Sequence, residues 1–221
     1  MDAEAPHASP IRSKLDALGC VPVFLGEAIS KGFYTELSNG GLWPLLHSRL
    51  NELPLRIGGW GSYREANERF ADAIADEYEA DDVVWVHDYQ LALVPAAVRR
   101  RLPGARIGFS FHVPFPPLEI LRAFPWWREM VGGMLGADVI GFHTEEFAAN
   151  FRAAVAEIHS LAPGDSRLPR DVEVVVSPVG VNADEWQQRA EDPKVLEMAD
   201  GIRQEAKGRK LLLAVDRLDY T

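Results

Sequence analysis

The stretch that decides the fold is VVWVHDYQLALVPAAVRRRLPGARIGFSFHVPFP, residues 83–116. Two short apolar runs rich in Val, Ile and Phe flank a segment with helical spacing, which is the pattern of a strand, a helix and a second strand. Each apolar run ends in a polar side chain, Asp88 in the first and His112 in the second. Ligands of open parallel sheets bind beyond the carboxyl ends of strands, so we expect both side chains to face one crevice.

The same alternation continues on both sides of this stretch. Val21–Leu25 has the composition of a short buried strand, and 63–79 carries the apolar stripe of an amphipathic helix. Further on we expect a helix over 118–135 that is interrupted at Pro125, strands at 137–144, 172–176 and 210–215, and helices at 145–158 and 192–209. Alternating strands and helices predict an α/β fold: a Rossmann-like parallel sheet with helices on both faces.

The composition is that of a globular protein with no nucleic-acid or membrane partner. The chain has 221 residues, of which 47% are hydrophobic, and its net charge of −10 opposes binding to a nucleic-acid backbone. A single cysteine, Cys20, excludes an internal disulfide and suits a reducing compartment. No apolar run approaches the roughly 20 residues of a membrane span, and the acidic start is unlike a signal peptide. We therefore expect a cytoplasmic location.

Two aromatic residues lie on either side of a predicted turn. Ser38-Asn39-Gly40-Gly41 is a loop signal, so Tyr34 and Trp43 would bracket a flexible segment. Aromatic side chains in such a place either stack on a sugar ring or fill the core, and the residue types leave the two interpretations nearly even.

Two further polar residues have both a structural and a functional interpretation. His143 follows a predicted strand and is either a ligand contact or a helix cap, and its neighbour Thr144 favours the cap. Arg217 has Asp216 and Asp219 beside it, which favours a surface ion pair over a phosphate contact when only residue types are considered.

The chain lacks the motifs of several common enzyme classes. It has no Cys-x-x-Cys pair for zinc and no Gly-x-Ser-x-Gly elbow for a serine hydrolase. His87 and Asp88 are adjacent on an extended backbone, so they point to opposite faces and are poor joint metal ligands. Neither the Gly-x-Gly-x-x-Gly nor the P-loop pattern occurs. We expect no metal and no cofactor.

Six motifs resemble, in order, those of the α,α-trehalose-phosphate synthases: FYTELSNGGLWPLLH, VWVHDYQLALVP, RIGFSFHVPFPPLEILRAFPWW, LGADVIGFHTEEFAANF, VSPVGVNADEW and VDRLDYT. The similarity extends from about Val21 to Thr221, and an ordered set of this size is highly specific. It implies the GT-B architecture, in which two Rossmann-like domains face a cleft. It also implies a retaining glycosyltransferase that moves glucose from a nucleotide sugar, usually UDP-glucose, to glucose 6-phosphate.

The resemblance also implies roles for individual residues. Tyr34 and Trp43 are similar to the aromatic residues that line the acceptor-sugar site, and Asp88 resembles the carboxylate that binds acceptor hydroxyls. His112 resembles the histidine near the donor glucose and the reacting centre. Arg217 resembles the arginine that holds the donor diphosphate, which replaces the ion-pair interpretation.

The mechanism implied by the family differs from the paired-carboxylate scheme of retaining glycosidases. The acceptor hydroxyl attacks from the face that the diphosphate leaves, and a phosphate oxygen takes its proton. Asp88 is then expected to bind the acceptor rather than to act as a nucleophile.

The resemblance covers only part of such an enzyme. Nothing before Val21 resembles the family's glycine-rich loop. In the family, the second domain comes after the motif that corresponds to VDRLDYT. We expect a tail at 1–10, most of the acceptor-side domain at 11–207 and the first strand of the nucleotide-sugar domain at 208–221. Such a fragment would be inactive alone, and full-length members would be homo-oligomers. The alternatives are a glucosyltransferase with another phosphorylated acceptor, such as a glucosylglycerol-phosphate synthase, and a non-catalytic sugar-phosphate-binding module.

Overall fold

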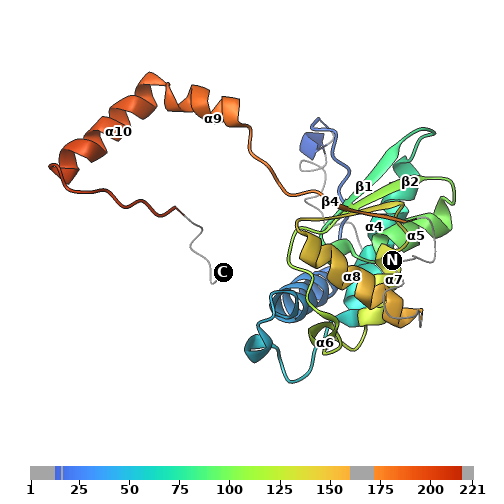
Figure 1. Ribbon diagram of the computed structural model, residues 1–221. Coiled ribbons are helices and arrows are strands. Elements are labelled where there is room, and N and C mark those ends of the chain that lie inside the picture. The colour runs from blue at the N-terminus through green and yellow to red at the C-terminus, as the bar shows by residue number, and fades with distance from the viewer. Residues whose placement is uncertain (1–12, 16, 160–171, 216–221) are drawn as a thin grey trace. The chain divides into compact units, whose positions relative to one another are not determined.

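The structure is a computed structural model that describes residues 13–15, 17–159 and 172–215 (Figure 1). Its internal contacts divide the chain into two compact units, Met1–Pro178 and Val179–Thr221. The first unit holds the sheet and the hydrophobic core, and the second holds two helices. The predicted tail at 1–10 and Arg217 lie outside the described residues.

A four-stranded parallel sheet lies at the centre of the first unit, with its strands in the order β1-β2-β3-β4. These strands are β1 (Val83–His87), β2 (Arg106–Ser110), β3 (Val139–Phe142) and β4 (Glu173–Val176). The register places His87 opposite Ser110, so β1 and β2 end side by side. The predicted parallel α/β fold is confirmed, including the strand, helix and strand of residues 83–116.

The helical elements of the first unit mostly match the apolar stripes in the sequence. They are α2 (Glu27–Ser30), the wide π-type helix η1 (Lys31–Leu42), α3 (Trp43–Leu46), η2 (Leu50–Glu52), α4 (Trp60–Glu77), η3 (Tyr89–Leu91), α5 (Val94–Arg101), α6 (Leu118–Leu121), α7 (Trp127–Met134) and α8 (Glu145–Ile158). The predicted interruption at Pro125 is confirmed, because this residue lies between α6 and α7. The strand predicted at Val21–Leu25 and the turn predicted at 38–41 are not observed.

Within the described part of the first unit, the helices that connect the strands lie along one face of the sheet. Helix α4 contacts α5, α5 contacts α7, and α7 contacts α8, so the four form one layer on one side of the strands (Figure 1). Connections between parallel strands are nearly always right-handed, and strands that follow sequence order therefore place every crossover on the same face. Val83 and Trp85 of β1 point to the other face and are 62% and 65% exposed. Within the described residues, no helix covers them.

The segment predicted as the strand Val21–Leu25 has no regular secondary structure. Val21 and Phe24 are about half exposed, and no described strand pairs with this segment. An apolar run becomes a strand only where a neighbour completes its hydrogen-bond ladder, so composition alone was a poor guide here.

The turn predicted at 38–41 is part of the helix η1 instead. Ser38 is buried and its hydroxyl donates to the carbonyl oxygen of Phe33 at 2.7 Å. A Cβ added to Gly41 would approach Ile57 to 3.0 Å. The glycine therefore serves close packing, and the same residue type that indicates a loop also permits a tightly packed helix.

The second unit contains α9 (Ala183–Ala190) and α10 (Pro193–Ala206). The Asn182 side chain caps α9, since it accepts from the Glu185 backbone N–H at 3.2 Å. The strand predicted at 210–215 is not formed in the structure, where these residues have no regular secondary structure and no strand partner. Among the described residues, no helix combines the length and apolar composition that a bilayer crossing requires.

Candidate functional site

Asp88 follows the last residue of β1 in an unusual backbone conformation. Its φ of 70° and ψ of 169° fall in a region that residues other than glycine rarely occupy. Its Oδ1 accepts hydrogen bonds from the backbone N–H groups of Tyr89 at 3.0 Å and His112 at 3.1 Å. The carboxylate therefore joins the ends of β1 and β2, and the predicted meeting of Asp88 with His112 is observed.

Two buried side chains of α4 hold the segment that follows Asp88. The Tyr63 hydroxyl donates to the carbonyl oxygen of Tyr89 and accepts from the N–H of Ala92. Asn67 accepts from the N–H of Leu93 at 3.1 Å. Burial raises the pKa of Tyr63, so its hydroxyl keeps the proton that it donates. The strained Asp88 is thus backed by a fully paired polar cluster.

Three histidines stand at the ends of three neighbouring strands. Nδ1 of His87 lies 2.9 Å from Nε2 of His112, and Nδ1 of His112 lies 3.4 Å from Nε2 of His143. The helix cap predicted at His143 belongs to Thr144 instead, whose hydroxyl oxygen accepts from the N–H of Phe147 at 3.2 Å. The cap interpretation of His143 was therefore wrong.

The sequence contained a signal for this row that residue-by-residue interpretation missed. Each of the first three strands is an apolar run followed by histidine: VVWVH, RIGFSFH and VIGFH. Parallel strands end at the same edge of a sheet, so a residue type repeated at three strand ends predicts a cluster.

His112 is half-buried among these groups. Burial lowers its pKa, Asp88 opposes this by favouring the charged form, and His87 and His143 lower the pKa further. The net result is a pKa below the usual histidine value, so the ring is mainly neutral near pH 7. A neutral imidazole has one donor and one acceptor nitrogen.

The aromatic residues Tyr34 and Trp43 both lie on the helical segment that precedes α4. Tyr34 is 52% exposed, whereas Trp43 packs against the core and stacks on His47 with ring centroids 3.9 Å apart. Asn39 of the same segment accepts from the Tyr89 hydroxyl at 3.4 Å. This contact brings η1 to the residue next to Asp88, although no described contact joins Tyr34 or Trp43 to Asp88 or His112.

The described residues contain no group of three or more His, Cys, Asp or Glu side chains arranged to hold a metal ion. The histidine row illustrates why. His112 faces His87 with Nε2 and His143 with Nδ1, so the three rings cannot direct lone pairs at one ion. The expectation of a metal-free protein stays a prediction.

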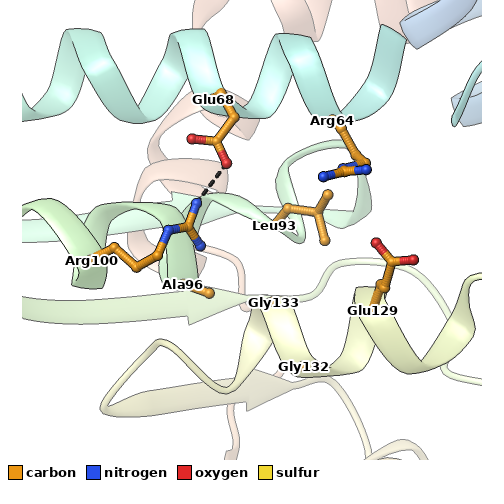
Figure 2. Close-up of a pocket in the computed structure, with 8 residues that line it drawn as sticks. All are labelled: Arg64, Glu68, Leu93, Ala96, Arg100, Glu129, Gly132 and Gly133. Atoms are coloured by element: carbon orange, nitrogen blue, oxygen red, sulfur yellow. Dashed lines mark hydrogen bonds and ion pairs between the residues drawn. The ribbon is translucent and has the colours of Figure 1, made fainter. Parts of the chain in front are cut away.

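A pocket of about 360 Å³ lies in the helical layer, between α4, α5 and α7 (Figure 2). Its lining combines two arginines, two glutamates, two glycines and two apolar side chains: Arg64, Glu68, Leu93, Ala96, Arg100, Glu129, Gly132 and Gly133. Arg100 already pairs with Glu68 at 2.6 Å, and the formal charges of the lining cancel. None of the residues predicted for the site lines this pocket, so it is distinct from the strand ends.

The sequence matches a known family along nearly its whole length. The model of the family described as Glycosyltransferase family 20 matches residues 2–221, a longer stretch than the similarity expected from about Val21. The α,α-trehalose-phosphate synthase (UDP-forming) A of Dictyostelium discoideum is 38% identical over 91% of this chain and 28% of its own length. The 56 kDa subunit of the corresponding synthase of Saccharomyces cerevisiae is 34% identical over 93% of this chain and 43% of its own length.

Solved structures agree with the sequence matches. The N-terminal domain of the Candida albicans trehalose-6-phosphate phosphatase superposes with a TM-score of 0.81 and 29% identity, covering 93% of this chain and 46% of its own. The UDP-forming synthase of Burkholderia xenovorans superposes with a TM-score of 0.73 and 31% identity, covering 89% of this chain and 45% of its own. These neighbours have the GT-B architecture, so the predicted fold class is confirmed. The chain spans less than half the length of the curated relatives named here.

Proposed function

Because this chain belongs to glycosyltransferase family 20, we propose that it forms the acceptor side of an enzyme that makes trehalose 6-phosphate. The reaction transfers glucose from UDP-glucose to glucose 6-phosphate with retention of anomeric configuration. The single observation that supports this most strongly is the Asp88 carboxylate, fixed at the end of β1 beside His112 in a chain similar to such synthases. Residues 11–207 then form the acceptor-side domain, and 208–221 begin the domain for the nucleotide sugar.

Asp88 is proposed to bind hydroxyl groups of the acceptor. Its Oδ1 is occupied by two backbone N–H groups, whereas Oδ2 makes no hydrogen bond within the described part of the chain. An ionised carboxylate oxygen accepts more than one hydrogen bond, and bonds to a charged group contribute about 1.5–3 kcal/mol. Because one oxygen is structural and the other is open, Asp88 suits a binding role better than covalent chemistry.

The other site residues are proposed to surround the two sugars. The exposed ring of Tyr34 offers an apolar face for the acceptor, and Trp43 is proposed to line the same sugar site. His112 lies next to Asp88 and would face the donor glucose. Arg217 would hold the departing diphosphate, since a guanidinium fork matches phosphate oxygens.

Calorimetric titration of the 221-residue chain with glucose 6-phosphate tests the acceptor role. We expect binding at one site, and a loss of affinity of about tenfold or more in Asp88→Asn, because a charged acceptor is replaced by an amide. Asp81→Asn is the matched control. Asp81 is also an aspartate with positive φ, but it precedes β1 at the opposite end of the strand.

Each outcome of this titration has a distinct meaning. Absence of glucose 6-phosphate binding to the unmodified chain would contradict the proposal, as would equal losses in Asp88→Asn and Asp81→Asn. Tighter binding of glycerol 3-phosphate would favour a glucosylglycerol-phosphate synthase. Adding UDP-glucose and measuring released UDP tests the expected inactivity of the isolated chain, which UDP release above background would contradict.

A further inference from the structure

The imidazoles of His87, His112 and His143 form a row across three adjacent strand ends. The rings of His87 and His112 are nearly parallel, with an interplanar angle of 6° and centroids 5.2 Å apart. Their nitrogens are much closer, at 2.9 Å, so the rings meet edge to edge through a hydrogen bond rather than face to face. His143 meets the opposite edge of His112 at 65° and 3.4 Å, which is a longer contact.

We propose that His87 and His143 are positioning residues that hold the His112 ring between them and restrict its tautomer. The three side chains then act as one hydrogen-bonded unit at the edge of the site. This inference rests on the proposed function only for the role of His112 beside the donor glucose; the row itself is a property of the folded chain.

The row permits few arrangements of protons. Each contact between two ring nitrogens requires one hydrogen, and a neutral imidazole carries only one. Either His143 donates to His112 and His112 donates to His87, or both hydrogen bonds run in the opposite direction. A tautomer change at His112 therefore requires the same change at both neighbours. A sugar hydroxyl that bonds to one end of the row would select one of these two directions.

Protonation affects the row in two distinct steps. The charged or titratable groups that face His112 are Asp88 after β1, His87 on β1 and His143 after β3. One added proton is tolerated on the central ring, since an imidazolium donates to both neighbours and lies beside a carboxylate. A second proton would place two N–H groups against each other and separate the rings. Protonation of His112 should therefore depend on both neighbouring rings.

Imidazole nitrogen-15 NMR of the whole 221-residue chain measures this directly, without any substrate. Long-range nitrogen-proton spectra report the tautomer and the titration midpoint of each histidine. The variants are His143→Ala, His143→Gln and His87→Ala. Glutamine restores a polar amide near the position of the histidine Nε2, so it tests rescue of the hydrogen bond without a second titrating ring.

We expect His143→Ala to change the nitrogen shifts of His112 and to raise its midpoint, because His143 disfavours the charged form of the His112 ring. His143→Gln should return the nitrogen shifts toward those of the unmodified chain while the midpoint stays raised. His87→Ala should alter the Nε2 signal of His112. His159→Gln, at the end of α8, is the matched control and should change neither the nitrogen shifts nor the titration midpoint of His112.

The signals of His47, which contacts Trp43 at a distance from the row, report whether each variant remains folded. Unchanged nitrogen shifts and midpoint of His112 in both alanine variants, with His47 undisturbed, would overturn the proposal. Because no sugar is present, this result is independent of the glucose 6-phosphate titration. Failure of the proposed function would appear in the glucose 6-phosphate titration and would leave the NMR outcome unaffected.

Discussion

Asp88 combines strain and binding capacity in one residue. Its backbone conformation costs about 1–3 kcal/mol in any residue other than glycine. The two hydrogen bonds to Oδ1 and the Tyr63–Asn67 cluster behind it offset that cost. Strain of this kind is retained where a side chain must be presented at a particular point, which agrees with the proposed contact to the acceptor.

A comparison of two substitutions separates this strain from the carboxylate. Asp88→Gly and Asp88→Ala both remove the acceptor oxygens, but only glycine adopts positive φ freely. Relief of about 1–3 kcal/mol exceeds the roughly 0.4–1 kcal/mol of additional chain entropy, so the glycine variant should be the more stable. Urea denaturation measures this. The same pair at helical Glu119 should show the opposite order, and an alanine advantage at Asp88 would contradict the strain argument.

The lowered pKa of His112 predicts how stability depends on pH. The folded state binds its proton less tightly than the unfolded chain does, so the unfolded state holds more protons below about pH 6.5. The contribution of this residue to stability is present above that pH. It is lost as pH falls from the unfolded-state pKa toward the lower folded-state pKa of His112. Urea midpoints between pH 7.5 and 5.5 should therefore fall less in His112→Asn than in the unmodified chain. An equal fall in both would contradict this assignment.

At the scale of elements, the site depends on how closely the helices pack beneath the sheet. Gly133 of α7 faces α5 so closely that an added Cβ would lie 2.6 Å from the carbonyl oxygen of Ala92 and 2.8 Å from Cα of Leu93. Those residues belong to the segment that follows Asp88. The packing of α7 therefore supports the same turn that α4 holds by hydrogen bonds.

Two adjacent glycines in α7 provide a matched test of this packing. Gly133→Ala should lower the free energy of unfolding by about 1–3 kcal/mol, because the carbonyl oxygen of Ala92 and Cα of Leu93 are backbone atoms that cannot move aside. Gly132→Ala meets no atom within 4 Å and should raise stability by up to about 1 kcal/mol through helix propensity. Thermal unfolding of both variants measures the difference. Similar effects at the two positions would show that the close approach is unimportant.

At the scale of the whole molecule, the two compact units differ in how they bury apolar residues. Every member of the hydrophobic core belongs to Met1–Pro178. In the described part of the second unit, the large apolar residues of α10 are exposed: Val195, Leu196, Met198 and Ile202. Stability should therefore reside in the first unit.

Removing the second unit tests this distribution. A chain that ends at Pro178 should keep the urea midpoint of the full chain, because no core residue is lost. Its near-ultraviolet circular dichroism should also retain the signal of the packed aromatic cluster around Trp60 and Trp126. A clearly lower midpoint would show that residues 179–221 contribute to the folding of the first unit.

The sequence alone was sufficient to predict the helices and strands in which the spacing of apolar residues reflects which side chains are buried. Helix α4, the strand-helix-strand unit around Asp88 and the division between α6 and α7 all follow from local periodicity or proline chemistry. The meeting of Asp88 with His112 followed from one rule about parallel strand ends. The family was evident from six motifs in order, because the residue identities of a motif distinguish families better than hydrophobic periodicity does.

Tertiary contacts decided the rest. Val21–Leu25 and 210–215 have strand composition, but no described strand pairs with them, and the glycines after Ser38 lie in a packed helix instead of a turn. The strand order put all the crossover helices on one face. The histidine row exists only because β1, β2 and β3 end side by side. Local pattern determines which elements form, whereas pairing between distant segments determines which side chains meet.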